Sequence, residues 1–221
     1  MITREQFVQM TEAVCIGNDV TYQDIVGLAA SAKKYHFLMA YAPTCFAKYL
    51  VEMLKGSPIL IGAPVTGSDY GADPTEIKIA LAKYFLDLGC TELDMMINLM
   101  YLQSKMYDEV LDDIKQVRKA AGHVCLKVII ESPLLTEEEI KIACRMVMDG
   151  GADYVKTSTG TYGKTTVEQV KLIRETVGDK IKIKAAGGIN GVGMIQELID
   201  LGVSRFGLSY KKAEAIADEL Q

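Results

Sequence analysis

Three lysines lie in short apolar segments of the sequence that have the composition of buried strands. They are Lys127 in CLKVIIE, Lys156 in ADYVKTS and Lys184 in IKIKAAG. Lysine is rarely buried unless it is paired or takes part in chemistry. In a cluster, each ammonium disfavours charge on the next, and desolvation acts in the same direction. We therefore expect a neutral amine at the ends of these strands, and a neutral amine in a cleft attacks a carbonyl carbon to form a Schiff base.

An acidic residue accompanies the lysines. Asp94 lies in ELDMMIN, and the alternation of side chains along a strand places it on one face with Met96 and Asn98. A structural salt bridge to one lysine is one interpretation of this residue. A carboxylate beside lysines can also hold them and relay protons, so the two roles are compatible.

Glycines follow the last two predicted strands. Gly187 and Gly188 lie in AAGGIN, and Gly207 precedes Ser209 in FGLS. Each of these motifs taken alone is typical of a tight turn. Together, at the seventh and eighth strand ends of a barrel, they indicate a phosphate site built from backbone N–H groups and a helix N-terminus.

Eight β-rich segments alternate with segments of helical period along the whole chain. The expected strands are 12–16, 36–42, 58–64, 91–98, 125–131, 152–158, 181–187 and 205–209, and the helical segments include 21–35, 74–89, 106–122, 136–151, 166–178 and 191–202. Eight units of about 28 residues each predict a TIM (β/α)8 barrel, in which the active face is the one where strands end. No linker or change of composition divides residues 1–221, so one domain is expected. A doubly wound open sheet is the alternative, but the first strand lacks the G-x-G-x-x-G turn of a dinucleotide-binding version.

Composition excludes several classes of function. The net charge of -5 provides no positive field for nucleic acid or anionic lipid. The five cysteines form no C-x-x-C pair and the chain has only two histidines, so no metal site is predicted. The N-terminal segment is charged where a signal peptide is apolar, and no apolar run approaches the length of a membrane span. The sequence predicts a cytoplasmic protein with no membrane or nucleic-acid partner.

Five segments of the sequence are similar to one enzyme family. VKTSTG, LKVIIE, KAAGGI, ELDMMIN and the closing GLS resemble deoxyribose-phosphate aldolase, a class I aldolase of the TIM-barrel group, and the likeness extends roughly from residue 74 to residue 209. The resemblance implies a lyase that cleaves 2-deoxyribose 5-phosphate to acetaldehyde and glyceraldehyde 3-phosphate, without metal or cofactor. It also implies a role in deoxyribonucleotide and carbohydrate catabolism, and a homodimer is an expectation on the same basis.

The resemblance also implies a role for each candidate residue. Lys156 would form the Schiff base, Lys184 would be the neighbouring lysine that favours its neutral amine, and Lys127 would support the network. Asp94 would take part in proton relay. The substrate and its phosphate would be bound by these residues: Thr157, Ser158, Thr159, Gly160, Gly187, Gly188, Gly207 and Ser209.

The first three predicted strands depart from the family pattern. An Asp-x-Thr-x-Leu run is replaced at Glu12, Val14 and Ile16, so a threonine hydroxyl that would reach the substrate is missing. The second strand has Ala40 and Ala42 in place of a Cys-x-Asn-Pro pattern, and Ala63 replaces a phenylalanine in the third. We expect a wider cavity on this side unless Tyr41 or Tyr70 fills it. The glycine-rich loop 65–74 is a candidate lid.

These departures leave alternative functions open. A class I aldolase for a different sugar phosphate keeps the lysines and changes the substrate. A barrel that binds a sugar phosphate without catalysis keeps the fold alone, although the intact set of lysines argues against it. A nicotinamide-dependent reductase lacks its fingerprint.

Overall fold

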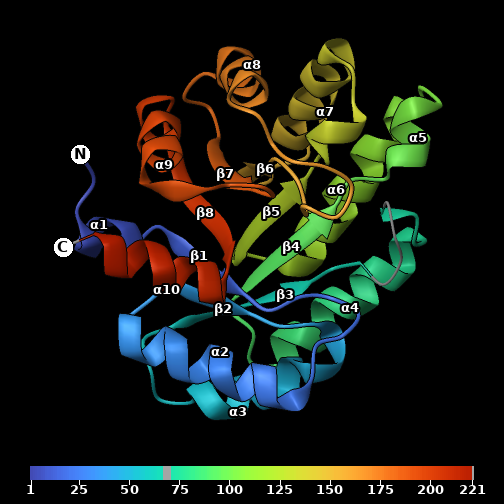
Figure 1. Ribbon diagram of the computed structural model, residues 1–221. Helices are drawn as coiled ribbons and strands as arrows, with labels where there is room; N and C mark the ends of the chain where they lie inside the picture. The colour runs from blue at the N-terminus through green and yellow to red at the C-terminus, as the bar shows by residue number, and fades with distance from the viewer. Residues whose placement is uncertain (67–70, 221) are drawn as a thin grey trace.

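Eight parallel strands form a closed barrel in chain order in a computed structural model that describes residues 1–66 and 71–220 (Figure 1). The first strand pairs with the last, which closes the ring. The strands are β1 (Thr11–Val14), β2 (Met39–Tyr41), β3 (Leu60–Pro64), β4 (Glu92–Met96), β5 (Cys125–Ile129), β6 (Tyr154–Lys156), β7 (Lys182–Ala186) and β8 (Val203–Ser209). The predicted TIM barrel is confirmed, and the open-sheet alternative is wrong because β1 and β8 pair directly.

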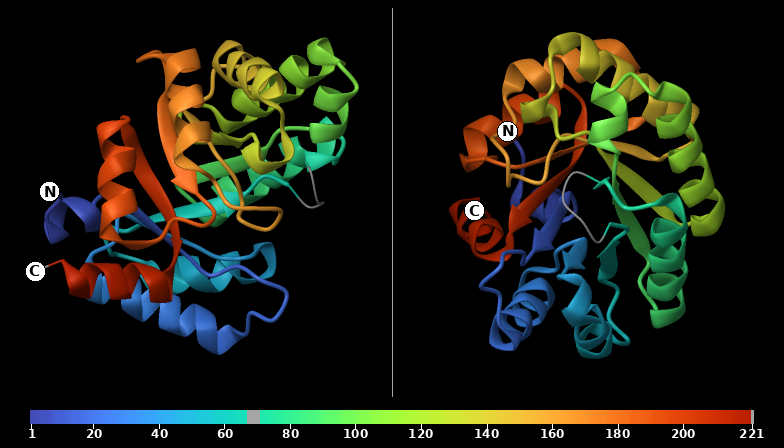
Figure 2. Two further views of the ribbon diagram at one scale, coloured as in Figure 1. Left: turned by 45° about the horizontal axis from the view of Figure 1, so that its top comes forward. Right: turned by 90° about the vertical axis from the view of Figure 1, so that its right-hand side faces the viewer.

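Helices surround this barrel, as the right-hand view of Figure 2 shows. The six helices expected from the sequence form as α2 (Tyr22–Tyr35), α4 (Thr75–Leu88), α6 (Tyr107–Ala121), α7 (Glu137–Asp149), α8 (Val167–Val177) and α9 (Gly191–Asp200). Further helical segments that the prediction did not include are α1 (Arg4–Val8), η1 (Thr44–Phe46), α3 (Ala47–Leu54), α5 (Leu99–Gln103), η3 (Ser132–Leu134) and α10 (Tyr210–Glu219). Helix α10 begins directly after β8, where the sequence predicts the phosphate site.

Local sequence fixes where several helices begin. Thr21, Thr136 and Thr166 are N-caps of α2, α7 and α8, and each threonine side chain accepts a hydrogen bond from the backbone of the third helical residue. That residue is Asp, Glu or Gln, and its side chain accepts in return from the cap backbone, which completes a capping box. Two N–H groups that have no partner within the helix are satisfied in this way. The threonine therefore sets the residue at which each helix begins.

Alternation along the strands separates two layers of side chains. Leu93 and Met95 of β4 and Leu126 and Val128 of β5 are fully buried and belong to the hydrophobic core between strands and helices. The residues between them point into the barrel, and Asp94 and Lys127 are both buried there. The apolar layer therefore holds the helices in place, while the barrel interior is charged.

Two predicted features are only partly covered by the described residues. The expected lid 65–74 includes residues 67–70, and Tyr70 also lies outside the described residues. Within residues 1–66 and 71–220, no helix has the length and apolar character needed to cross a membrane. All five cysteines are free.

Candidate active site

The barrel brings the three predicted lysines together on neighbouring strands. Lys156 is the last residue of β6 and pairs in register with Lys184 of β7, while Lys127 is the middle residue of β5. The expectation that all three end their strands holds for Lys156 alone, because β5 and β7 each continue for two residues beyond their lysine. Lys127 and Lys184 consequently lie deeper, with no exposed surface, and Lys156 is 8% exposed.

Asp94 connects all three lysines. Its Oδ2 atom lies 2.7 Å from Nζ of Lys156 and 2.8 Å from Nζ of Lys184, and its Oδ1 atom lies 2.9 Å from Nζ of Lys127. The carboxylate is buried, so these three ammonium donors replace its water. The predicted salt bridge of Asp94 is present and extends to all three lysines, while its role in proton relay stays a prediction.

The sequence prediction missed three further charged residues of this cluster. Glu12 of β1 forms an ion pair with Lys184, and its Oε1 lies 3.5 Å from Nζ of Lys127. Arg205 of β8 contacts both Glu12, at 3.1 Å, and Glu92, at 2.5 Å. Lys127 also contacts Glu92, at 2.6 Å. A signal was present: Glu92 lies two residues before Asp94 on the same face of its strand, and Glu12 occupies a predicted strand.

Burial and neighbouring charges set the protonation of the cluster. Burial opposes charge on Asp94, but the three lysines outweigh it and hold the pKa of Asp94 well below its usual value. Burial also opposes charge on Lys127, and Asp94, Glu12 and Glu92 outweigh it and raise the pKa of Lys127 well above its usual value. For Lys184, burial together with the charges of Lys156 and Lys127 lowers the pKa to about 8, against the opposing effect of Asp94 and Glu12. One lysine of the group is therefore ready to give up its proton near neutral pH.

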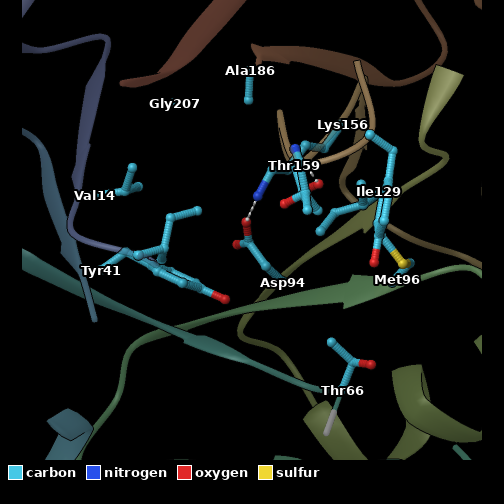
Figure 3. Close-up of a pocket in the computed structure, with 13 residues that line it drawn as sticks. Val14, Tyr41, Thr66, Asp94, Met96, Ile129, Lys156, Thr159, Ala186 and Gly207 are labelled. Carbon is cyan, nitrogen blue, oxygen red and sulfur yellow. Dashed lines mark hydrogen bonds and ion pairs between the residues drawn. The ribbon is translucent and has the colours of Figure 1, made fainter. Parts of the chain in front are cut away.

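A pocket opens above the cluster, at the face where the strands end (Figure 3). Lys156 lines it, and Lys127 and Lys184 do not. Its lining residues are Val14, Ile16, Tyr41, Thr66, Asp94, Met96, Ile129, Lys156, Thr159, Thr161, Tyr162, Ala186 and Gly207. The pocket thus combines one amine, one carboxylate and several hydroxyl groups with an otherwise largely apolar wall.

The residues of the turn Thr157–Ser158–Thr159–Gly160 have two different surroundings. The hydroxyls of Thr157 and Ser158 are buried and donate to the carbonyl of Ala186, at 3.0 and 2.9 Å, so they join β6 to the end of β7. Thr159 lines the pocket, and its backbone N–H donates to the carboxylate of Glu131, at 3.0 Å to the nearer oxygen. Glu131 is buried in a left-handed conformation, and sequence reasoning did not assign it a role at the site.

The glycines after β6 and β7 allow two loops to touch. Gly160 and Gly187 have φ values of 85° and 82°, and a Cβ atom on Gly160 would lie 3.0 Å from the Cα atom of Gly187. A Cβ atom on Gly187 would overlap the hydroxyl of Ser158. Side chains are therefore excluded from both positions on steric and conformational grounds.

The other predicted phosphate residues are spread around the rim. Gly207 lines the pocket, and Gly188 is exposed beside Lys164. Ser209 lines an adjacent hollow with Lys211, and its side chain caps α10 by accepting from the backbone N–H of Lys212 at 3.4 Å. The structure places these residues at the same end of the barrel as Lys156, with Ser209 outside the lysine pocket itself.

Comparison with known proteins places this arrangement in a family. The model of the DeoC/LacD family aldolases matches residues 13–208, which is most of the chain. The chain belongs to this family.

Individual relatives and solved structures are also similar to this chain. The DeoC/LacD chain described here is 38% identical to the deoxyribose-phosphate aldolase of Mycoplasma mobile, over 92% of this chain and 94% of the relative. It is 42% identical to the deoxyribose-phosphate aldolase of Mycoplasmopsis pulmonis, over 85% of each chain. Among solved structures, an aldolase named QR15 superposes with a TM-score of 0.90 at 28% identity, covering 96% of this chain and 95% of that one. A tetrameric deoxyribose phosphate aldolase from Aeropyrum pernix has the same fold, with a TM-score of 0.86 at 24% identity, covering 98% of this chain and 92% of that one.

Proposed function

We propose that this DeoC/LacD family aldolase reversibly cleaves 2-deoxy-D-ribose 5-phosphate to acetaldehyde and D-glyceraldehyde 3-phosphate through a Schiff base on Lys156. The observation that carries the choice of nucleophile is accessibility. Of the three lysines around Asp94, Lys156 alone lines the pocket and has exposed surface. A substrate carbonyl can reach its Nζ atom, whereas Lys127 and Lys184 have no exposed surface.

The chemistry follows from the charges around Lys156. The neutral amine adds to carbon 1 of the open-chain sugar, and loss of water from the carbinolamine gives an iminium ion. This ion accepts the electron pair of the bond between carbons 2 and 3 as that bond breaks, while the 3-hydroxyl proton passes toward Asp94 and Lys184, which lie 2.8 Å apart. Protonation of the enamine at carbon 2, followed by addition of water, releases acetaldehyde and restores the amine.

The phosphate would lie at the end of β7 and β8. Gly187 and Gly188 provide backbone N–H groups, Gly207 lines the pocket, and Ser209 is the N-cap of α10. An anion at this place is favoured by the N-terminal end of a ten-residue helix and by the nearby ammonium of Lys211. In this proposal the phosphate fixes carbon 5, so that carbon 1 reaches Lys156.

Three further expectations belong to the same proposal. The reaction needs no metal or cofactor, since the iminium ion is the electron acceptor; no group of His, Cys, Asp and Glu that could hold a metal occurs among the described residues. A homodimer and a cytoplasmic location remain predictions. The deoxyribose phosphate aldolase of Aeropyrum pernix is a tetramer, so assembly needs its own measurement in this chain.

The test combines trapping with turnover. The protein is incubated with deoxyribose 5-phosphate, reduced with borohydride and digested, and the modified lysine is located by mass spectrometry, while acetaldehyde release is assayed with and without a chelator. We expect an adduct on Lys156 and chelator-resistant acetaldehyde. An adduct on a different lysine, or turnover that the chelator abolishes, would overturn the mechanism.

A second candidate keeps the mechanism and changes the substrate. It is favoured by the wall that Val14, Ile16 and Tyr41 form, because Val14 and Ile16 are positions where the sequence departs from the family pattern, and Tyr41 lies between the departures at Ala40 and Ala42. Kinetics with a panel of phosphorylated sugars decide between the two. Turnover of deoxyribose 5-phosphate alone supports the first function, and an adduct without acetaldehyde supports the second. Binding without any adduct would instead indicate a non-catalytic barrel.

A further inference from the structure

Tyr41 faces Lys156 across the pocket. It is the last residue of β2, and its ring centroid lies 5.7 Å from Nζ of Lys156. The residue in register on β3 is Gly62, where a Cβ atom would lie only 2.9 Å from the tyrosine ring. The glycine therefore leaves the space that the ring occupies. A substrate bonded to Lys156 would therefore lie beside this ring.

The hydroxyl of Tyr41 has no partner among the residues that the structure describes. Figure 3 shows it directed into the pocket, on the side where Asp94 and Thr66 lie. Burial and the negative charge of Asp94 raise the pKa of Tyr41 well above its usual value, so the group remains an O–H donor across the neutral range. Tyr41 lines the pocket, so a ligand oxygen there can accept a hydrogen bond from this hydroxyl.

The remainder of this wall is apolar. The pocket-lining residues from β1, β2 and the segment after β1 are Val14, Ile16 and Tyr41, and only the tyrosine carries a polar side-chain atom. Val14 is in register with Tyr41, so the two side chains are neighbours on adjacent strands. Val14 is also the position where the family pattern has a threonine. A hydroxyl missing from β1 is thus present one strand away.

We propose that the Tyr41 hydroxyl donates a hydrogen bond to the 4-hydroxyl of the sugar phosphate and makes Tyr41 a specificity-determining residue. The inference rests on the proposed function, in which the other substrate atoms already have partners. Carbon 1 is bonded to Lys156, the oxygen on carbon 3 exchanges its proton with Asp94 and Lys184, and the phosphate lies at Gly187 and Gly188. The 4-hydroxyl is the one substrate oxygen left, and among the described residues of the facing wall Tyr41 is the donor without a partner.

The effect of this hydrogen bond on kcat/KM can be measured by itself in the synthetic direction of the reaction. Acetaldehyde is condensed either with glyceraldehyde 3-phosphate, whose 2-hydroxyl becomes the 4-hydroxyl of the product, or with 3-phosphooxypropanal, which lacks it. We expect Tyr41→Phe to lower kcat/KM about tenfold for glyceraldehyde 3-phosphate and to leave kcat/KM for 3-phosphooxypropanal nearly unchanged. The preference of the enzyme for the hydroxylated acceptor should decrease by the same factor.

Control measurements distinguish a failure of the proposed Tyr41 hydrogen bond from a failure of the proposed aldolase function. Tyr84→Phe on the exposed face of α4 is the matched control and should leave both rates unchanged. Borohydride trapping of acetaldehyde on Lys156 should be equal in Tyr41→Phe and the unchanged protein. Equal losses with both acceptors, or no loss with either, would overturn the role of Tyr41 while trapping still supports the aldolase. Absence of trapping and turnover in the unchanged protein would instead overturn the proposed function.

Discussion

Two groups of buried lysines and carboxylates occur in this protein, and they differ in how their charges are matched. Between α4 and α6, Lys78 has no exposed surface and lies 2.5 Å from Asp113. Thr75 donates to the other oxygen of Asp113 at 2.8 Å, so one cation meets one carboxylate whose two oxygens are both satisfied. In the barrel, Lys127, Lys156, Lys184 and Arg205 face Glu12, Glu92 and Asp94, which among the described residues is four cations against three carboxylates.

The two groups differ in charge balance, and this difference distinguishes the structural Lys78–Asp113 pair from the reactive cluster in the barrel. A neutral pair has no reason to release a proton, because either change of protonation leaves an uncompensated charge in a buried place. A group with one excess positive charge is relieved when one ammonium loses its proton, and neutral Lys184, whose pKa is lowered to about 8, can then accept the proton of Lys156 before Lys156 attacks a carbonyl. Charge balance, rather than burial alone, therefore distinguishes the lysines that do chemistry.

The largest effect on activity is expected from Lys156→Met. Removal of the nucleophile should reduce acetaldehyde release by at least about 10³-fold and abolish borohydride trapping. The same change leaves three cations facing three carboxylates, so thermal unfolding followed by circular dichroism should show a melting temperature that is not lowered. A variant that unfolds at a clearly lower temperature would contradict the excess of positive charge.

Lys78→Met should lower stability and leave activity unchanged, which is the opposite of the result expected for Lys156→Met. It leaves Asp113 buried with Thr75 as its one side-chain partner among the described residues, and we expect a loss of about 3–5 kcal/mol in the free energy of unfolding, measured with urea. Activity per folded molecule should be unchanged. Lys83→Met, on the exposed face of the same helix, is the control and should change stability by less than about 0.5 kcal/mol. Recovery of most of the loss in Lys78→Met/Asp113→Leu would confirm that the unpaired carboxylate is its cause.

The sequence predicted the barrel and the lysines because both depend on local pattern. Strands of four to eight apolar residues and helices that begin at Thr21, Thr136 or Thr166 are recognisable without tertiary contacts. Helix α10 was missed although it has a buried face at Ala213, Ile216 and Ala217, because it follows β8 with no intervening loop to mark its start.

The rest of the site depends on which strands become neighbours. Arg205 and Glu92 are 113 residues apart in sequence, so their contact could not be read from either segment alone. The same is true of Glu131, which meets the backbone of Thr159 only because β5 and β6 are adjacent. Tyr41 was predicted to fill space, whereas its unpartnered hydroxyl becomes visible only when the pocket is assembled.

Lys184→Met tests whether Lys184 accepts the proton that Lys156 must lose before it attacks a carbonyl. The pKa of Lys184 is lowered to about 8, so in the unchanged protein the rate of adduct formation should rise with pH through about 8. Above that pH Lys184 is neutral and can act as the base. Without this base, the rise should move to higher pH by about one unit, which lowers the rate at pH 7 about tenfold. Rapid borohydride quenching between pH 6 and 10 measures the rate of adduct formation. Lys182→Met, at the exposed start of β7, is the control.

Glu12→Gln should have the smallest effect on the rate of adduct formation. It should displace the pH dependence of that rate in the direction opposite to Lys184→Met. The negative charge of Glu12 raises the pKa of Lys184, so its removal should lower that pKa and move the rise in rate to lower pH, by less than about one unit. The amide keeps the volume of the side chain, and Glu92 still holds Arg205 through contacts of 2.5 and 3.1 Å. A merely structural role for Glu12 would lower the amount of folded enzyme and leave the pH dependence in place. Opposite displacements in Glu12→Gln and Lys184→Met would show that the balance of charges in the barrel, and not the packing of any one residue, sets the pH at which the amine becomes available.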